Sequence, residues 1–309
     1  MPPSDTFFTT SPGWEWLVIL YFFFGGLAGG SFFLAAMVDL FGEERDRPLA
    51  RLGYYTAFVS FLPAAPLLIL DLTRPERFWH MLIQSERAPL PMFKWWSPMS
   101  VGSWALLIFG LFSFLAAVGA LAQSGRLPWE PLRVLRHDGL KMIIAVLGGL
   151  VGFFLASYTG VLLTVTNRPI WADTNLLGLL FLFSAASTAA ALLLLVARGG
   201  REVVPTSLGW LERMDRWALV LELLVLIVAV ISLGAVAQAW FNVWGLTLVL
   251  GVVVVGILVP LVLEWRSDLL GNLTVPAAAV LVLIGGFLLR MVIVMSSEGI
   301  REVTTWLIR

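Results

Sequence analysis

The sequence lacks cysteine altogether and has only two histidines among its 309 residues. Without thiolates, it cannot hold an iron–sulfur cluster in the usual way and cannot form a disulfide. His80 and His137 both fall between the long apolar runs, whereas histidines inside the spans commonly hold a membrane-embedded haem. These absences argue against a cluster, a haem or a zinc site of the usual nitrogen and sulfur type in this protein. Any redox role must therefore use a bound organic molecule or a cofactor on a partner.

Charged residues are also scarce. They make up 13% of the chain and hydrophobic residues 59%, compared with about 25% and roughly 45–50% in soluble domains. A water-soluble core could not hide this much apolar surface. The 20 basic and 20 acidic residues balance, so nothing indicates nucleic acid. The first apolar run is too long for a secretory signal and follows no positive start, so we expect it to be a retained helix.

Long apolar runs continue from near the start of the chain to near its end. A helix needs roughly 20 apolar residues to cross about 30 Å of hydrocarbon, and the strict alternation of a transmembrane strand is absent. We therefore predict an all-α bundle of eight transmembrane helices that forms a single membrane domain over residues 1–309. The predicted spans are residues 16–38, 52–70, 98–122, 142–166, 176–197, 217–238, 243–263 and 273–297.

The connections between these spans differ in charge. Those on one side of the predicted bundle carry 12 lysines and arginines, and those on the other side, with the tails, carry 7. The positive-inside rule then places both termini on the periplasmic side of a prokaryotic inner membrane. Three connections are long, at residues 71–97, 123–141 and 198–216.

Only two of the spans carry a charge, Glu222 in the sixth and Arg290 in the eighth. Charge inside hydrocarbon costs about 2.5–3.5 kcal/mol on insertion scales, so its presence suggests a function by default. Asp39 and Glu264 lie at the inner ends of spans 1 and 7. Together the four residues are candidates for a proton path. The alternatives are a structural partner for Arg290 and an interfacial position for Asp39 and Glu264.

Two of the four tyrosines fall in the outer halves of spans, Tyr21 in the first and Tyr158 in the fourth. A buried phenol needs a hydrogen-bond partner, which a quinone oxygen would supply, although packing alone is the simpler explanation. Both tyrosines are predicted at the same depth and on the side of the long connection at residues 71–97. Small residues around Gly26 allow close helix approach, and a flat ring or an isoprenoid tail is an alternative occupant of such a groove.

Six short motifs, in order, resemble the NrfD/PsrC-type family of membrane subunits, as in polysulfide reductase. They lie at residues 26–30 (GLAGG), 71–78 (DLTRPERF), 97–104 (SPMSVGSW), 157–160 (SYTG), 167–171 (NRPIW) and 285–290 (GGFLLR). Each motif is short, but the ordered set spans most of the chain. The eight helices and the outer termini agree with that family.

The resemblance implies a subunit without metal that binds menaquinol or ubiquinol near the outer face. It also implies a docked iron–sulfur subunit of the ferredoxin-like 4Fe-4S type and, through it, a molybdopterin enzyme or a haem protein. Tyr158 matches the family's quinone-contacting tyrosine, and Tyr21 stands where the polysulfide-reductase type has a histidine. Glu15 and Val18 replace polar residues nearby, and Gly26 belongs to the same site. The residues expected at the outer mouth or docking surface are Asp71, Arg74, Arg77, Arg168 and Trp171.

We therefore predict a quinone-binding membrane anchor of a respiratory oxidoreductase, in which the catalytic centre lies in a partner. Electrons would pass between the quinol and the partner's cluster, with Glu15 and Asp71 as acceptors of the released protons. Two alternatives are a transporter or ion channel, which would need broken helices with paired charges at the midplane, and a passive anchor without a quinone site.

Overall fold

The computed structural model describes residues 13–84, 90–125, 134–135, 137–199, 203–266 and 269–297. Helices dominate this part of the chain, and its two strands, β1 (Ile83–Gln84) and β2 (Leu90–Pro91), form one short antiparallel pair. The all-α prediction is confirmed. The helices are α1 (Trp16–Phe41), α2 (Arg47–Leu70), α3 (Pro98–Gln123), α4 (Asp138–Thr164), α5 (Leu177–Gly199), α6 (Pro205–Ser232), α7 (Val243–Leu246), α8 (Val259–Trp265) and α9 (Thr274–Ser296).

Within the described residues, seven helical segments are long and apolar enough to cross a membrane. One of them joins α7, a π-helical stretch (Thr247–Leu258) and α8 into a single span. The count reaches eight when α6 and the short 3-10 helix that follows it, η5 (Gly234–Trp240), are taken as one span bent by 108°. The chain is therefore a multi-pass membrane protein, as its composition predicts.

The bounds predicted for the sixth span are wrong at both ends. Helix α6 begins at Pro205, inside the stretch predicted as a connection, and ends at Ser232. Charged side chains at residues 212, 213, 215 and 216 lie outside the apolar run and yet inside this helix. Pro205 occupies a first-turn position where its missing N–H costs nothing. The bend follows at Gly234, whose positive φ of 52° is a backbone conformation that glycine adopts readily.

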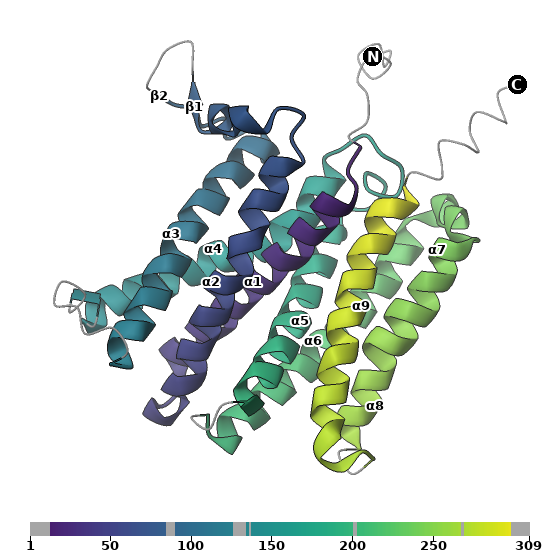
Figure 1. Ribbon diagram of the computed structural model, residues 1–309. Helices are drawn as coiled ribbons and strands as arrows, with labels where there is room; N and C mark the ends of the chain where they lie inside the picture. Colours follow the sequence, from purple (N-terminus) through teal and green to yellow (C-terminus); the bar gives the residue numbers. More distant parts are fainter. Residues whose placement is uncertain are drawn as a thin grey trace, which may run out of the picture.

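The helices form an elongated bundle (Figure 1). The start of α1, the end of α9 and the β1–β2 pair lie at one end, which we call the upper end, as drawn in Figure 1. The α8–α9 connection and the start of α2 lie at the other, lower end. The lower end corresponds to the side that carries more basic connections in the sequence.

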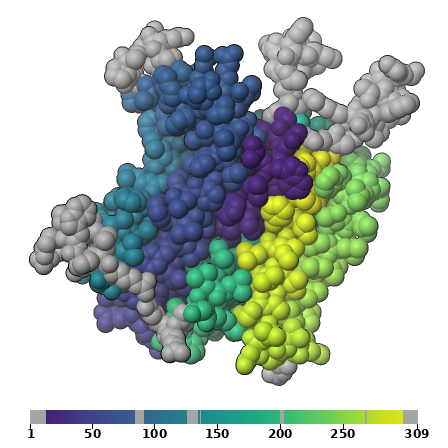
Figure 2. Space-filling model, viewed as in Figure 1, coloured from purple at the N-terminus to yellow at the C-terminus, as the bar shows by residue number. Residues whose placement is uncertain are grey.

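Helix α1 packs against α2, α4, α5 and α9, and it is the most deeply buried of the membrane-spanning helices. Figure 2 shows it (purple) between α2 (blue) and α9 (yellow). Two glycines allow this packing. A Cβ on Gly29 would lie 3.2 Å from the backbone nitrogen of Ala156 in α4, and one on Gly30 would lie 2.8 Å from the Cβ of Ala189 in α5. Small residues at such crossings allow close helix approach in lipid.

Candidate ligand-binding site

A cavity of about 300 Å³ lies at the upper end of the bundle, between α1, the end of α2, α3 and α4. Both predicted tyrosines line it, together with Val18 and Asp71. Cavities that bind small molecules are mostly apolar with a few placed polar groups, and this cavity has that character.

The two tyrosines differ in their hydrogen bonds. The Tyr158 hydroxyl donates to the carbonyl oxygen of Pro98 at 2.7 Å, at the first turn of α3. Gly102, one turn further along α3, makes room for the phenol, because a Cβ there would collide with the Tyr158 ring. The Tyr21 side chain is completely buried, and its hydroxyl has no hydrogen-bond partner in the described part of the chain. A buried polar group without a partner calls for an explanation.

The other residues predicted around the tyrosines are spread more widely. Val18 is buried on the cavity wall, one turn before Tyr21. Asp71 follows the last residue of α2, and its pKa is raised, chiefly by burial and then by the negative charge of Glu15. Glu15 itself is exposed and does not line the cavity. Gly26 lies deeper, where a Cβ would come within 2.8 Å of the Arg290 guanidinium.

Two stacked indoles close the cavity toward the α4–α5 connection. Trp14, on the cavity wall, stacks on the buried Trp171, with ring centroids 5.5 Å apart. The Trp171 indole N–H donates to the carbonyl oxygen of Ile293 in α9 at 2.7 Å. The Arg168 guanidinium lies 4.9 Å from the Trp171 ring centroid and donates to Ser297. Arg168 and Trp171, which were predicted at the outer mouth or docking surface, are therefore buried, and they pack behind Trp14 of the cavity wall.

The turn that carries Trp171 is strained. Ile170 has a φ of 69°, a left-handed conformation that is a genuine outlier for a β-branched residue. Such a conformation costs of the order of 1–3 kcal/mol and persists only where the surroundings impose it. Here the Ile170 N–H donates to the Asp173 carboxylate at 2.9 Å, and the side chain is buried. Arg74 and Arg77, by contrast, are exposed on the α2–α3 connection and lie outside the cavity.

An apolar groove of about 500 Å³ between α2 and α3 lies beside the cavity. The groove and the cavity share five lining residues: Leu68, Leu72, Met81, Ser103 and Leu106. Leu107, Leu111 and Phe114, which also line the groove, are exposed on the outside of the bundle, where they face the lipid in a membrane. The cavity and the groove therefore lie side by side, with these five residues between them.

Arg290 lies at the centre of a buried polar cluster below the cavity. Its Nε donates to the carbonyl oxygen of Phe22, a residue of the cavity wall, and its Nη1 donates to Ser184 at 3.1 Å. The Ser187 hydroxyl, one turn along α5, donates to the Glu222 carboxylate at 2.9 Å. Glu222 and Arg290 are both buried. The polar cluster therefore connects α5, α6 and α9 with the back of the cavity.

The two remaining charges predicted for a proton path lie at the lower end. Glu264 of α8 pairs with Arg216 of α6 at 3.5 Å, and the carboxyl group of Asp215 lies beside it. Asp39 of α1 is held elsewhere, by an ion pair with Lys141 of α4 and a hydrogen bond from Tyr54 of α2. The described structure therefore does not bring Asp39 into contact with the other three charges.

Sequence analysis missed three features of these sites: Trp14 in the cavity wall, Gly102 behind Tyr158, and Asp215. Asp215 was placed in a connection because charged neighbours surround it. Its spacing of seven residues from Glu222 was a usable signal, since two helical turns put both side chains on one face of α6, about 10 Å apart. Trp14 contacts Trp171, and Gly102 makes room for Tyr158. Contacts between residues so far apart in the sequence leave no pattern in the sequence around either residue.

Comparisons with known proteins identify the family and several relatives of this chain. The family described as polysulphide reductase, NrfD, matches residues 6–300. The chain is 26% identical to Protein NrfD of Escherichia coli, covering 96% of this chain and 99% of that protein. It is 28% identical to one of the chains of the polysulfide reductase of Wolinella succinogenes, over 81% and 82% of the two sequences. It is 30% identical to one of the subunits of the selenate reductase of Mesobacillus selenatarsenatis, but over only 35% of this sequence and 22% of that one.

Proposed function

The chain belongs to the polysulphide reductase NrfD family, and we propose that it binds menaquinol or ubiquinol in the upper cavity and passes electrons to an iron–sulfur subunit. Family membership makes it a membrane subunit of a reductase complex in the prokaryotic inner membrane. The finer proposal rests chiefly on one observation. A buried tyrosine hydroxyl without a partner in the described chain lines a cavity that lies beside an apolar groove on the outside of the bundle.

The hydrogen-bonding capacity of the two tyrosines suits both redox forms of the ring. The Tyr158 O–H is already donated to Pro98, so its oxygen is left to accept a hydrogen bond from a quinol hydroxyl. The Tyr21 O–H is available to donate to the carbonyl of the oxidised ring. The apolar groove takes the isoprenoid tail, and the ring enters laterally between α2 and α3.

When bound, the quinol supplies two electrons and releases two protons. Asp71 takes up one proton at the cavity wall, where burial and the charge of Glu15 raise its pKa and make it a better proton acceptor than an ordinary aspartate. Glu15, exposed at the upper end, passes protons to the aqueous phase on the side predicted to be periplasmic. The exposed Arg74 and Arg77 would hold a partner at the upper end, and a 4Fe-4S cluster in that partner would accept the electrons. The partner in turn serves a molybdopterin-type enzyme or a haem protein.

Proton translocation by the complex would need a path on the lower side as well. We include Glu264, Glu222 and Arg290 in such a path and add Asp215, because these groups follow one another from the lower end toward the back of the cavity. Asp39 is left out, since Lys141 and Tyr54 already hold its carboxylate.

Purification from native membranes together with neighbouring subunits tests the proposal. A co-purified quinone and an iron–sulfur subunit would support it. A protein that purifies alone and shows substrate-dependent flux would be a transporter instead. A complex with redox partners but without quinone would identify a passive anchor. The transporter has weaker support. It would need helices that are broken near the midplane of the membrane, whereas α6 runs for 28 residues, about 42 Å, before its break.

Replacing Tyr158 with phenylalanine is expected to lower quinol-dependent turnover about threefold to tenfold. The change removes one hydrogen bond to the ring, with a net contribution of about 0.5–1.5 kcal/mol. It also leaves the Pro98 carbonyl without its donor, so a lower unfolding temperature should accompany the lower turnover. Turnover that stays within about twofold of the wild type would remove Tyr158 from the site.

Replacing Ala65 with phenylalanine is expected to raise KM for a long-tailed quinol about threefold, with less effect on a short-tailed analogue. Ala65 lines the apolar groove, and the added ring would occupy the place of the tail. The effect is modest because lipid is as apolar as the groove, so the tail gains only packing there. Val59→Phe is the matched control, since Val59 lies on the same helix, is exposed, and lines neither the groove nor the cavity. Equal effects on both quinols would contradict a tail groove.

A further inference from the structure

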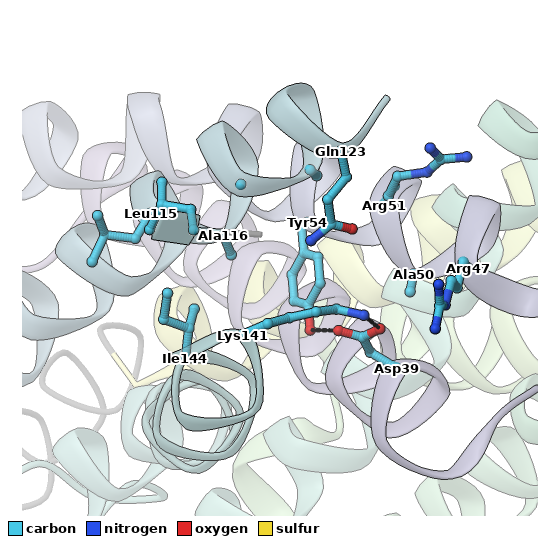
Figure 3. A pocket seen from close by; sticks show the side chains of 13 residues that line it. Asp39, Arg47, Ala50, Arg51, Tyr54, Leu115, Ala116, Gln123, Lys141 and Ile144 are labelled. Atoms are coloured by element: carbon cyan, nitrogen blue, oxygen red, sulfur yellow. Dashed lines mark hydrogen bonds and ion pairs between the residues drawn. The ribbon is translucent and has the colours of Figure 1, made fainter. Parts of the chain in front are cut away.

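A second, narrow pocket lies at the lower end of the bundle, where α1, α2, α3 and α4 meet (Figure 3). It is separate from the upper cavity and shares no lining residue with it. Three basic side chains line it, Arg47, Arg51 and Lys141. One acidic side chain, Asp39, lies among them.

The acidic group of this pocket is already satisfied. Asp39 forms an ion pair with Lys141 and accepts a hydrogen bond from the Tyr54 hydroxyl at 3.2 Å, as Figure 3 shows. The Asp39 side chain is only 4% exposed, so this triad forms the floor of the pocket. An ammonium group has three N–H donors, so Lys141 keeps donors beyond the one directed to Asp39.

The two arginines are not satisfied in the same way. The Arg51 side chain has no ion pair or hydrogen bond within the described part of the chain. Arg47 pairs with Glu44 at 3.2 Å, but both side chains are more than half exposed, and such pairs are weak. The two are four residues apart on α2, where like charges on one helix face repel each other. The pocket thus carries a net positive charge that an anion between the two guanidinium groups would neutralise.

The opposite side of the pocket is apolar. Leu115 and Ala116 of α3 and Ile144 of α4 lie across from the arginines in Figure 3. These residues belong to membrane-spanning helices and lie near the lower ends of their spans. A cationic rim beside an apolar wall at the end of a span matches one chemistry, a phosphate that is attached to acyl chains. Basic pockets between transmembrane helices on the cytoplasmic side bind such headgroups.

We propose that an anionic phospholipid of the surrounding leaflet binds at the rim of this pocket, with its phosphate at Arg47 and Arg51. Its acyl chains would lie on the outside of the bundle, because the pocket itself holds only about 20 Å³ and Ala116 and Ile144 are buried. The guanidinium fork suits phosphate oxygens, which it can engage with two parallel N–H donors. This site is independent of the upper cavity and of quinol chemistry. It would fix α2 against α3 and α4 at the end of the bundle opposite the upper cavity.

Lipid binding to the purified, lipid-stripped protein tests this proposal. Native mass spectrometry would measure adducts with phosphatidylglycerol and with phosphatidylcholine that has the same acyl chains. We expect wild-type protein to prefer phosphatidylglycerol, and each of Arg47→Gln and Arg51→Gln to reduce its affinity about fivefold, the factor that corresponds to about 1 kcal/mol per cation near the surface. Arg266→Gln is the matched control, because Arg266 is exposed in the α8–α9 connection at the same end.

Three outcomes would overturn the proposal: equal affinity for the two lipids, equal loss in the Arg266→Gln control, or displacement of the lipid by millimolar inorganic phosphate, which would indicate a site for the free anion. If Arg47→Gln fails to fold, the Arg51→Gln variant decides, since the Arg51 side chain has no partner in the described chain to lose. Its unchanged preference for phosphatidylglycerol would also contradict the site.

Discussion

Replacing Tyr21 with phenylalanine is expected to lower quinol-dependent turnover about tenfold without destabilising the quinone-free protein. Its hydroxyl is buried and has no partner in the described chain. Leaving such a group unsatisfied costs about 1–3 kcal/mol, so its removal should leave the unfolding temperature equal or higher. The same hydroxyl is proposed to donate to the quinone ring, and the loss of about 1.4 kcal/mol there corresponds to the tenfold effect. Turnover and thermal unfolding, with and without added quinone, measure both effects.

Tyr55 provides the matched control for this prediction. Its hydroxyl is also buried without a hydrogen-bond partner among the described residues, but it lies on α2 and lines neither the cavity nor the groove. Tyr55→Phe should therefore show the same stability as Tyr21→Phe and unchanged turnover. Added quinone should raise the unfolding temperature of wild-type protein and Tyr55→Phe more than that of Tyr21→Phe. If both variants lose turnover equally, the Tyr21 hydroxyl has no specific role.

The helices could be predicted closely where a span is long, apolar and uncharged. Helix α1 begins at the predicted residue, and α3 begins at its predicted residue and ends one residue later than predicted. The sixth span failed because helix formation and membrane burial are different properties. The start of α6 carries charged residues that are compatible with a helix but not with hydrocarbon, so hydropathy alone placed the helix start twelve residues late.

The sequence could locate the candidate site only through residues whose depth along a membrane span was enough to place them. The positions of Tyr21 and Tyr158 along their spans put both near the upper end, and in the structure they line one cavity. Their role in binding quinone stays a prediction. Trp171 was assigned to the outer mouth or docking surface through the family resemblance, and the sequence around it does not indicate its hydrogen-bond partner. That partner is the carbonyl oxygen of Ile293, 122 residues away along the chain, and no local pattern encodes such a contact.

The second large effect is expected in the buried polar cluster of Arg290 and Glu222. An arginine stays charged in proteins, and Arg290 is completely buried. Glu222 is the acidic group whose charge acts on it, and Ser184 and Ser187 of α5 lie between the two. Replacing Arg290 with methionine keeps much of the side-chain volume but leaves Glu222 buried without a counter-charge. Arg290 also donates hydrogen bonds to Phe22, Ser184 and Gly286. Leaving a buried polar group unsatisfied costs about 1–3 kcal/mol, and more for a charged group, so Arg290→Met should strongly lower the free energy of unfolding.

The double variant separates this charge coupling from simple packing loss. In Arg290→Met with Glu222→Gln, both charges are gone and the amide still reaches the Ser187 hydroxyl. We therefore expect a stability above the sum of the single changes, with an interaction energy of about 1–3 kcal/mol, as for residues in one network. Arg213→Met, at an exposed position at the lower end of the same helix α6, should stay within about 0.5 kcal/mol of the wild type. Strict additivity of the two changes would show that the cluster is not coupled.

Turnover in the same variants distinguishes a structural cluster from a proton path. Arg290 donates to the carbonyl oxygen of Phe22, which lines the cavity, so its loss should weaken quinol binding whichever role applies. Glu222 touches no cavity residue among its described hydrogen bonds. Glu222→Gln keeps the shape of the side chain but cannot exchange a proton as a carboxyl group does. If the path operates, this variant should retain quinol oxidation in uncoupled membranes and lose proton uptake from the lower side. Unchanged proton uptake would remove Glu222 from the path and leave it a structural role, as a buried group that helps to hold α6 to α5.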